Sequence, residues 1–197
     1  MLIEAILTDK DECPNVKFLM VEELKATQSE KVVDLLNQLK KEKFELAIEL
    51  GTQQGGFSVL VNGMLHCEVH TFDIQEWEPI DHKREVFQQR DIHYHIEDCF
   101  ESKGLIELLS YDRKKILFCD GGHKVNEFTY FAKYLSKGDF IGCHDFFKTY
   151  SSYNPEIWTT CEITLGEIQH TIDELSLKQV YKEESQNAAW GLFEVWA

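Results

Sequence analysis

The spacing of apolar residues from position 44 onward alternates between two periods. Short, almost continuous apolar runs predict buried strands of a parallel sheet at residues 44–50, 68–73, 91–96, 114–120 and 139–145. Between these runs, apolar residues recur at the helical period, which predicts helices at 56–65, 79–90, 102–110 and 123–138. Because strands and helices alternate, we predict a parallel sheet with helices on both faces and right-handed crossovers.

The C-terminal end breaks this rhythm. After a predicted helix at 164–175, two strand-like pieces, "SLKQVYKEE" and "NAAWGLFEVWA", are separated by only a few polar residues. Such a link is too short for a crossover helix, so the last two strands are predicted to form an antiparallel hairpin. The expected fold class is α/β: a Rossmann-like, doubly wound, seven-stranded mixed sheet, with five parallel strands and the C-terminal hairpin.

The N-terminal end is predicted to be a segment of its own. Residues 1–26 contain a single apolar patch, "VKFLMVEEL", and are expected to be irregular. The following "TQSEKVVDLLNQLKK" predicts an amphipathic helix that begins with a capping box formed by Thr27 and Glu30. We therefore expect an N-terminal segment and helix, residues 1–43, that pack on a domain formed by residues 44–197.

The charge of the chain narrows its possible partners. With 20 basic and 35 acidic residues, the formal net charge of −15 repels phosphate backbones and anionic lipid surfaces. The sequence contains no apolar run approaching the roughly 18 residues of a membrane span. We expect a cytoplasmic protein that acts on a small molecule, binds neither nucleic acid nor membrane, and could form a homo-oligomer.

Cysteine and histidine spacing gives little support for a metal site of the zinc type. The six cysteines are scattered without a C-x-x-C pair, so we expect reduced, structural thiols. His93 and His95 alternate with apolar residues in a predicted strand, so both face one side of the sheet. A third ligand is not evident nearby in the sequence, which disfavours a metal site at this pair.

Acidic residues gather where the predicted parallel strands end. Ligands of an open parallel sheet bind beyond the carboxyl ends of its strands. An acid lies at or just after the end of each of the five strands: Glu49, Asp73, Asp98, Asp120 and Asp145. This edge of the sheet is therefore the predicted ligand site.

The turn after the first parallel strand, in "IELGTQQGGFS", predicts which ligand is bound. A dinucleotide fingerprint needs a middle glycine so that the backbone can approach a pyrophosphate, and this chain has Gln53 between Gly51 and Gly55. S-Adenosylmethionine carries an adenosine and an amino acid but no phosphate. The turn therefore suits S-adenosylmethionine better than a dinucleotide.

Four motifs, in order, carry a family resemblance: "ELGTQQGGFS", "HTFDI", "ILFCDGGHKVNEFTYFAKYLSKGDFIGCHDF" and "WGLFEVWA". They resemble the class I S-adenosylmethionine-dependent methyltransferases, in particular the branch that includes cephalosporin-hydroxylase-like proteins and small-molecule O-methyltransferases. The resemblance implies that Asp73 accepts hydrogen bonds from the ribose hydroxyls and that Asp98 and Cys99 meet the adenine. The full implied set of cofactor-binding residues is Glu49, Gly51, Thr52, Gln53, Gly55, Asp73, Ile74, Asp98, Cys99 and Asp120. Asp73 and Asp98 could instead be ordinary turn or helix-capping acids.

The same resemblance implies a metal site and a catalytic base. In metal-dependent members, the acid after the fourth strand and two polar residues after the fifth bind a divalent cation, which here implies Asp120, His144 and Asp145 as ligands of Mg²⁺ or Mn²⁺. His123 stands where relatives carry the residue that takes the substrate proton, so His123 and Asp120 are the implied catalytic residues. Alternatively, Asp120 caps the following helix, His144 is a satisfied semi-buried histidine, and His123 only contacts solvent.

Two further segments could close over this site. The aromatic stretch at 145–158 is predicted to be a loop that lines a substrate pocket or merely covers the sheet edge. Gln28 and Thr27 precede the first parallel strand and could cover the cofactor, although the expected capping box already accounts for Thr27.

The favoured function is therefore methylation of a small-molecule hydroxyl with S-adenosylmethionine, with possible assistance from a divalent metal. A non-catalytic cofactor-binding or interaction module with the same fold is the alternative from a different class, since fold does not guarantee activity. An NAD-dependent oxidoreductase is disfavoured by the missing middle glycine and by the expected terminal hairpin.

Overall fold

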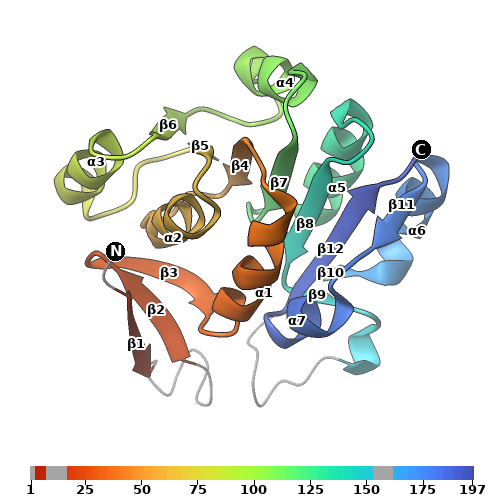
Figure 1. Ribbon diagram of the computed structural model, residues 1–197, viewed down its shortest axis with the longest axis horizontal. Coiled ribbons are helices and arrows are strands. Elements are labelled where there is room, and N and C mark those ends of the chain that lie inside the picture. Colours follow the sequence, from red (N-terminus) through yellow and green to blue (C-terminus); the bar gives the residue numbers. More distant parts are fainter. Residues whose placement is uncertain (1–2, 8–16, 153–161) are drawn as a thin grey trace.

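The computed structural model describes residues 3–7, 17–152 and 162–197, and a mixed sheet of seven strands forms its centre (Figure 1). Its strands are β4 (Leu46–Leu50), β5 (Glu68–Asp73), β6 (Ile92–Ile96), β7 (Lys115–Cys119), β8 (Phe140–His144), β11 (Leu177–Gln179) and β12 (Trp190–Val195). Their spatial order is β11-β12-β8-β7-β4-β5-β6. The first five strands in sequence run parallel, whereas β12 is antiparallel to both β8 and β11. The predicted fold class is confirmed.

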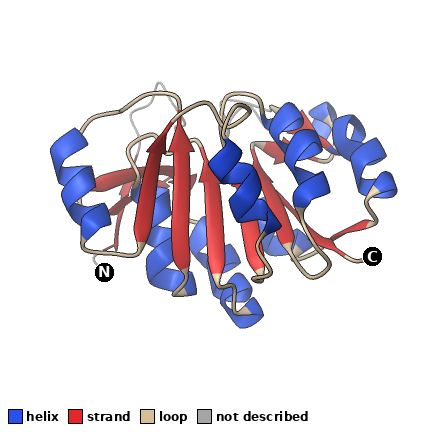
Figure 2. Cartoon of the chain, turned by 90° about the horizontal axis from the view of Figure 1, so that it is seen from above, coloured by secondary structure: helices blue, strands red, loops and turns tan. Residues whose placement is uncertain are grey.

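Helices cover both faces of this sheet (Figure 2). One face packs against α1 (Val32–Leu39), α2 (Gly56–Leu65), α3 (Ile80–Gln88) and α7 (Lys182–Asn187). The other face packs against α4 (Lys103–Ser110), α5 (Lys124–Phe131) and α6 (Leu165–Glu174). The smaller elements are η1 (Lys40–Glu42), η2 (Ala132–Tyr134), η3 (Tyr150–Ser152) and a parallel pair of short strands, β9 (Phe146–Phe147) and β10 (Ile163–Thr164).

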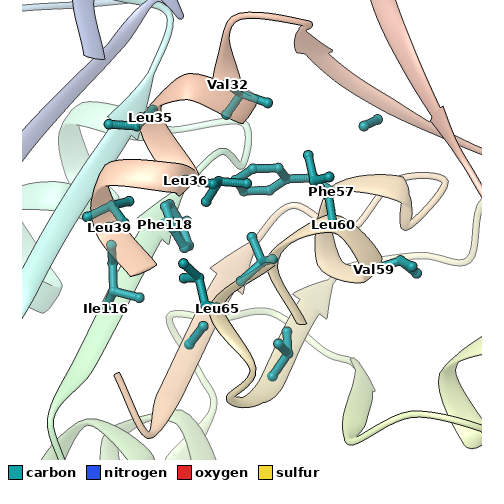
Figure 3. Close-up of a cluster of buried hydrophobic side chains, with 14 of the residues drawn as sticks. Val32, Leu35, Leu36, Leu39, Phe57, Val59, Leu60, Leu65, Ile116 and Phe118 are labelled. Carbon is teal, nitrogen blue, oxygen red and sulfur yellow. The ribbon is translucent and has the colours of Figure 1, made fainter. Parts of the chain in front are cut away.

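A layer of apolar side chains holds α1 and α2 against the sheet (Figure 3). Leu36 of α1 and Phe57 of α2 lie over Phe118 of β7, and all three side chains are at most 2% exposed. Phe57 contacts the Phe118 ring edge-on at 5.2 Å and stacks on Trp190 at 5.5 Å. The helix that follows the glycine turn is thereby fixed on the sheet by aromatic packing.

The N-terminal segment is a three-stranded antiparallel sheet, so the prediction of an irregular segment is wrong. Its strands are β1 (Ile3–Leu7), β2 (Lys17–Val21) and β3 (Leu24–Ser29). Alternate side chains such as Leu24 and Ala26 are buried and join the same core cluster as α1 and α2. A Cβ on Gly56 would lie 2.5 Å from the backbone nitrogen of Ala26, so glycine lets α2 approach β3 this closely. Burial against α2 therefore orders a segment whose own sequence carries only a weak strand signal.

The predicted capping box is also wrong. Thr27 lies within β3, and the helix begins at Val32 with Lys31 as its N-cap residue. Strand pairing between β2 and β3 has outweighed the local capping signal at Thr27 and Glu30. A capping box does form elsewhere, between Thr164 and Glu167 at the start of α6.

The C-terminal hairpin is confirmed, with one change inside it. "KEE", taken as part of a strand, belongs to the short helix α7 in the connection between β11 and β12. Because β11 and β12 pair antiparallel, this helix serves as a hairpin link and not as a crossover. The helix predicted at 123–138 likewise ends early, at Phe131, and continues as the η2 turn.

The four cysteines that the structure describes are free thiols, as the sequence predicts. Cys67, Cys119 and Cys143 are buried free thiols, and Cys99 is a half-buried one. Cys13 and Cys161 lie outside the described residues. Within the described part of the chain, no helix is long and apolar enough to cross a membrane.

Candidate functional site

The glycine turn after β4 is held against both neighbouring strands. Gly51 adopts φ +97° and donates its N–H to the carbonyl of Phe72, the penultimate residue of β5. A Cβ on Gly51 would lie 2.7 Å from the carbonyl carbon of Asp120. Gln53 also has a left-handed backbone, with φ +46°, which only a tightly constrained turn imposes on a non-glycine residue.

Gly51→Ala is expected to destabilise the fold by about 3 kcal/mol, because alanine adds both the left-handed strain and an overlap with the backbone of Asp120. The matched control is Gly122→Ala, since a Cβ there would have no heavy atom of the described residues within 4 Å. Chemical denaturation of both variants measures the difference. Equal free energies of unfolding would contradict this description of the turn.

Asp73 ends β5 and faces the same turn. One carboxylate oxygen accepts the backbone N–H of Gln53 at 2.9 Å, and the other accepts that of Gln75 at 3.3 Å. Ile74, the next residue, is 74% exposed, an unusual fraction for an isoleucine. Lys83 of α3 completes the arrangement, since its buried ammonium donates to the carbonyl oxygens of Gln53 and Trp77 at 3.0 and 2.8 Å.

Glu49 lies beneath the turn and is 2% exposed. Its carboxyl group accepts hydrogen bonds from Ser58 of α2 and from Thr71 of β5, and the Thr71 hydroxyl lies 2.6 Å from that of Thr52. Burial outweighs these hydrogen bonds and raises the pKa of Glu49 to about 8. The carboxyl group therefore ties the turn to α2 and β5 from inside the protein.

Asp98 and Cys99 follow β6 at the same edge. Asp98 accepts the backbone N–H of Phe100 at 2.9 Å, which closes a local turn. The helix after it is capped by Ser102, so the alternative in which Asp98 starts that helix is wrong. Burial raises the pKa of the Cys99 thiol to about 12, and its side chain packs on the core beside α4.

Asp120 is the centre of a buried polar cluster beyond β7 and β8. Its side chain, 5% exposed, accepts hydrogen bonds from Gln28 of the N-terminal sheet and from His144 Nδ1 at 3.0 Å. Burial alone would raise the pKa of Asp120, but His144, Lys124 and Gln28 outweigh it and lower this pKa. The same pairing raises the pKa of His144 despite its burial. Gln28 therefore reaches the polar cluster at this edge, and its covering of a cofactor stays a prediction. Asp120 does not cap α5, because the N-cap residue of that helix is His123.

Asp145 brings a second carboxylate to the cluster. It follows β8 with φ +54°, and its Oδ2 lies 3.6 Å from His144 Nδ1. Asp120, His144 and Asp145 each present one ligand atom, and these atoms lie within 4.8 Å of one another. The structure thus brings together all three residues of the predicted metal site.

Lys124 is a site residue that the sequence analysis missed. Its side chain, 6% exposed, places Nζ 3.6 Å from Asp120 Oδ1 and 3.3 Å from Asp145 Oδ2, and it also binds the carboxylate of Glu162. Burial alone would lower the pKa of Lys124, but these three carboxylates raise it well above its usual value. An ammonium therefore stands among the oxygens that a divalent cation would use. The spacing of four residues from Asp120 gave no usable signal, because Asp120 precedes α5 and the two residues do not lie on one helix.

The donor set of this cluster nevertheless fits a divalent cation. Two carboxylates and an imidazole are ligands that Mn²⁺ accepts, and carboxylates alone are typical of Mg²⁺. Among the described residues, buried His144 Nε2 and Gln28 Oε1 have no hydrogen-bond partner. A bound ion or water is one explanation for buried polar atoms without a partner.

His123 lies apart from this buried cluster. Its side chain is exposed, while its backbone N–H donates to Glu127, which also accepts the N–H of Gly121. Burial raises the pKa of Glu127, whose carboxyl group fixes the loop between β7 and α5. His123 lines a pocket of about 300 Å³ together with Lys124 and Glu162. The aromatic stretch that begins at Asp145 lies only partly within the described residues, since those at 153–158 fall outside them.

Several solved structures that share this arrangement of strands and helices are named as methyltransferases. A structure of CmcI with Mg and S-adenosylmethionine aligns with a TM-score of 0.62 at 16% identity, over 90% of this chain and 76% of that one. The chain has the class I methyltransferase fold. The apo structure of CmcI gives a TM-score of 0.60 at 15% identity over 89% and 75% of the two chains. The methyltransferase PaMTH1 of Podospora anserina, bound to S-adenosylhomocysteine, gives 0.52 at 12% identity over 84% and 78%. No protein-family model and no curated protein sequence matches the chain.

Proposed function

We propose that the protein is an S-adenosylmethionine-dependent methyltransferase that methylates a hydroxyl group of a small molecule. The observation that carries this proposal is the glycine turn joined to Asp73 at the carboxyl edge of the sheet. The fold is shared with structures that hold S-adenosylmethionine or its product. Ligands of open α/β sheets bind at this edge.

The proposed cofactor site divides into three parts. Asp73 binds the ribose hydroxyls, because a carboxylate offers several acceptor sites and no competing donor. Exposed Ile74, with Asp98 and Cys99, covers the adenine. The glycine turn binds the amino-acid end of the cofactor through Gly51, Thr52, Gln53 and Gly55. Glu49 supports this turn from beneath, and Asp120 lies at the rim of the cofactor site.

The proposed acceptor site lies at the cluster of Asp120, His144 and Asp145. These residues would hold Mg²⁺ or Mn²⁺, and that ion would lower the pKa of a substrate hydroxyl. The ammonium of Lys124 must leave the two carboxylates when such an ion binds, since both occupy the same oxygens.

Proton removal is proposed for His123. During transfer, the acceptor oxygen forms a bond to the methyl carbon, the carbon–sulfur bond breaks, and the hydroxyl proton must pass to a base. Lys124 cannot be that base in its observed place, because its carboxylate partners keep it protonated. The exposed imidazole of His123, on the wall of the adjoining pocket, is a suitable group.

The proposal is tested by measuring S-adenosylhomocysteine formed from S-adenosylmethionine with a panel of small phenols, catechols and hydroxy acids. We expect turnover with at least one hydroxyl compound that increases when Mg²⁺ or Mn²⁺ is added. Tight cofactor binding without any turnover across the panel would instead support the non-catalytic binding module. The oxidoreductase alternative predicts NAD binding in place of S-adenosylmethionine binding.

Asp120→Asn is expected to remove the response to added Mn²⁺ while leaving the affinity for S-adenosylmethionine within about threefold, a difference of under 1 kcal/mol. The substitution removes one metal-binding charge, and the asparagine amide that replaces the carboxylate has the same size and still contacts Gln28 and His144. Calorimetry with the cofactor and with Mn²⁺ separates the two effects. An unchanged Mn²⁺ response would refute the metal assignment.

A further inference from the structure

A second group of metal-type side chains lies at the opposite end of the sheet. Glu68 and His70 are on one face at the amino end of β5, and His70 stands directly beside His93 of the parallel neighbour β6. Figure 1 shows β5 and β6 at one side of the sheet. Asp73 and the proposed cofactor site are at the carboxyl end of β5, so the two groups are separated along the strand. The group differs from the His93 and His95 pair considered in the sequence, because it contains His93 with Glu68 and His70 of β5 and does not contain His95.

The ligand atoms of this group converge on one point. His70 Nε2 lies 2.8 Å and His93 Nε2 lies 3.5 Å from the same carboxylate oxygen, Glu68 Oε1. The three ligand atoms lie within 4.8 Å of one another. Ligands about 2.0–2.1 Å from a tetrahedral Zn²⁺ are about 3.3 Å apart, which is close to both Glu68–histidine distances. The rings of His70 and His93 are stacked at an interplanar angle of 24°, so one of them must turn for both nitrogens to face a common ion.

Neighbouring residues hold these ligands in place. Arg113 binds the other oxygen of Glu68 at 2.5 Å, which leaves Oε1 turned toward the two histidines. His95 Nε2 lies 2.9 Å from His70 Nδ1, so the second nitrogen of that ring is already engaged. Histidines that bind metals are oriented in this way by a partner on their other nitrogen.

The surroundings also offer charge and access. The carboxylates of Asp91 and Glu97 lie 3.4 Å from His93 and 3.9 Å from His95. The guanidinium of Arg113 pairs with Glu68. The side chain of His93 is 49% exposed, which opens the group to solvent, whereas that of His70 is 11% exposed. A fourth position can be filled by Asp91 or by water.

We propose that Glu68, His70 and His93 form a binding site for a transition-metal dication of the Zn²⁺ type. Two imidazoles with one carboxylate favour Zn²⁺, Co²⁺ or Ni²⁺ over Mg²⁺, which prefers oxygen ligands alone. The ion would join β5 to β6 at the edge of the sheet. This site is independent of methyl transfer at the other end of the strands.

The test is calorimetric titration with Zn²⁺, together with visible absorption of Co²⁺, in the Asp120→Asn background, so that the other cluster contributes little. We expect one Zn²⁺ per chain. His93→Gln should weaken binding by more than about 100-fold, and His95→Gln, which removes only an orienting partner, by about 10- to 100-fold. His170→Gln is the matched control, because His170 is an exposed histidine 3.5 Å from Glu174.

The test uses His93→Gln because His93 is half-exposed, so this variant is expected to fold. His70 is more buried, and His70→Gln could fail to fold for reasons unrelated to metal binding. The absorption bands of bound Co²⁺ should disappear in His93→Gln and persist in His170→Gln. Equal Zn²⁺ affinity in the two variants, or no Zn²⁺ binding in the parent protein, would overturn the proposal. Loss of methyltransferase activity would not bear on it.

Discussion

Replacing Asp73 with alanine is expected to weaken S-adenosylmethionine binding by at least about 100-fold. The carboxylate is proposed to accept hydrogen bonds from the two ribose hydroxyls. A hydrogen bond to a charged group contributes about 1.5–3 kcal/mol. It also holds the backbone N–H of Gln53, so its loss loosens the turn that contacts the amino-acid end of the cofactor. Calorimetric titration of the variant measures the change.

Two further variants make this result specific. Asp112→Ala removes the same charge from an exposed position and should leave binding unchanged. Asp73→Asn keeps one acceptor oxygen and should fall between the wild type and Asp73→Ala. If Asp73→Ala binds the cofactor as well as Asp112→Ala does, Asp73 is an ordinary turn acid.

Lys124→Met is expected to lower the melting temperature by about 6–20 °C in metal-free buffer. Breaking a buried ion pair costs about 3–5 kcal/mol, and each kcal/mol shifts a domain of this size by about 2–4 °C. The loss removes the lysine ammonium from the buried carboxylates of Asp120 and Asp145 and leaves them with the imidazole of His144. Scanning calorimetry compares the melting temperature of this variant with that of the control Lys137→Met, which changes an exposed lysine.

The same variant should bind Mn²⁺ at least about tenfold more tightly than the wild type. In the wild type, the ion must displace the Lys124 ammonium from both carboxylates, and breaking such a buried ion pair costs about 3–5 kcal/mol. Added Mn²⁺ should therefore restore much of the lost melting temperature. Weaker Mn²⁺ binding in Lys124→Met would show that the carboxylates do not share one cation position between lysine and metal.

The seven-stranded sheet was predictable because strong patterns agreed with one another. The continuous apolar runs of β4, β7 and β8 fit strands covered on both faces, and all their residues are buried. The short link before Trp190 fixed the antiparallel direction of β12. Candidate residues could be placed at one edge because parallel strands align their carboxyl ends.

The N-terminal sheet and two side-chain groups were not predictable, for physical reasons. Residues 17–29 are ordered by packing on α2, and this tertiary contact overrode the local capping signal at Thr27. The position of Lys124 depends on Glu162, which is distant in sequence. Glu68 and His93 meet only because β5 and β6 pair in one register, which spacing within a single strand cannot show.

The central claim is that the carboxyl edge binds a phosphate-free cofactor. The most direct measurement is calorimetric titration of the whole chain with S-adenosylmethionine, S-adenosylhomocysteine and NAD. We predict that both sulfur compounds bind one per chain and that NAD gives no heat of binding. Absence of binding by both sulfur compounds, or binding of NAD in their place, would contradict the claim.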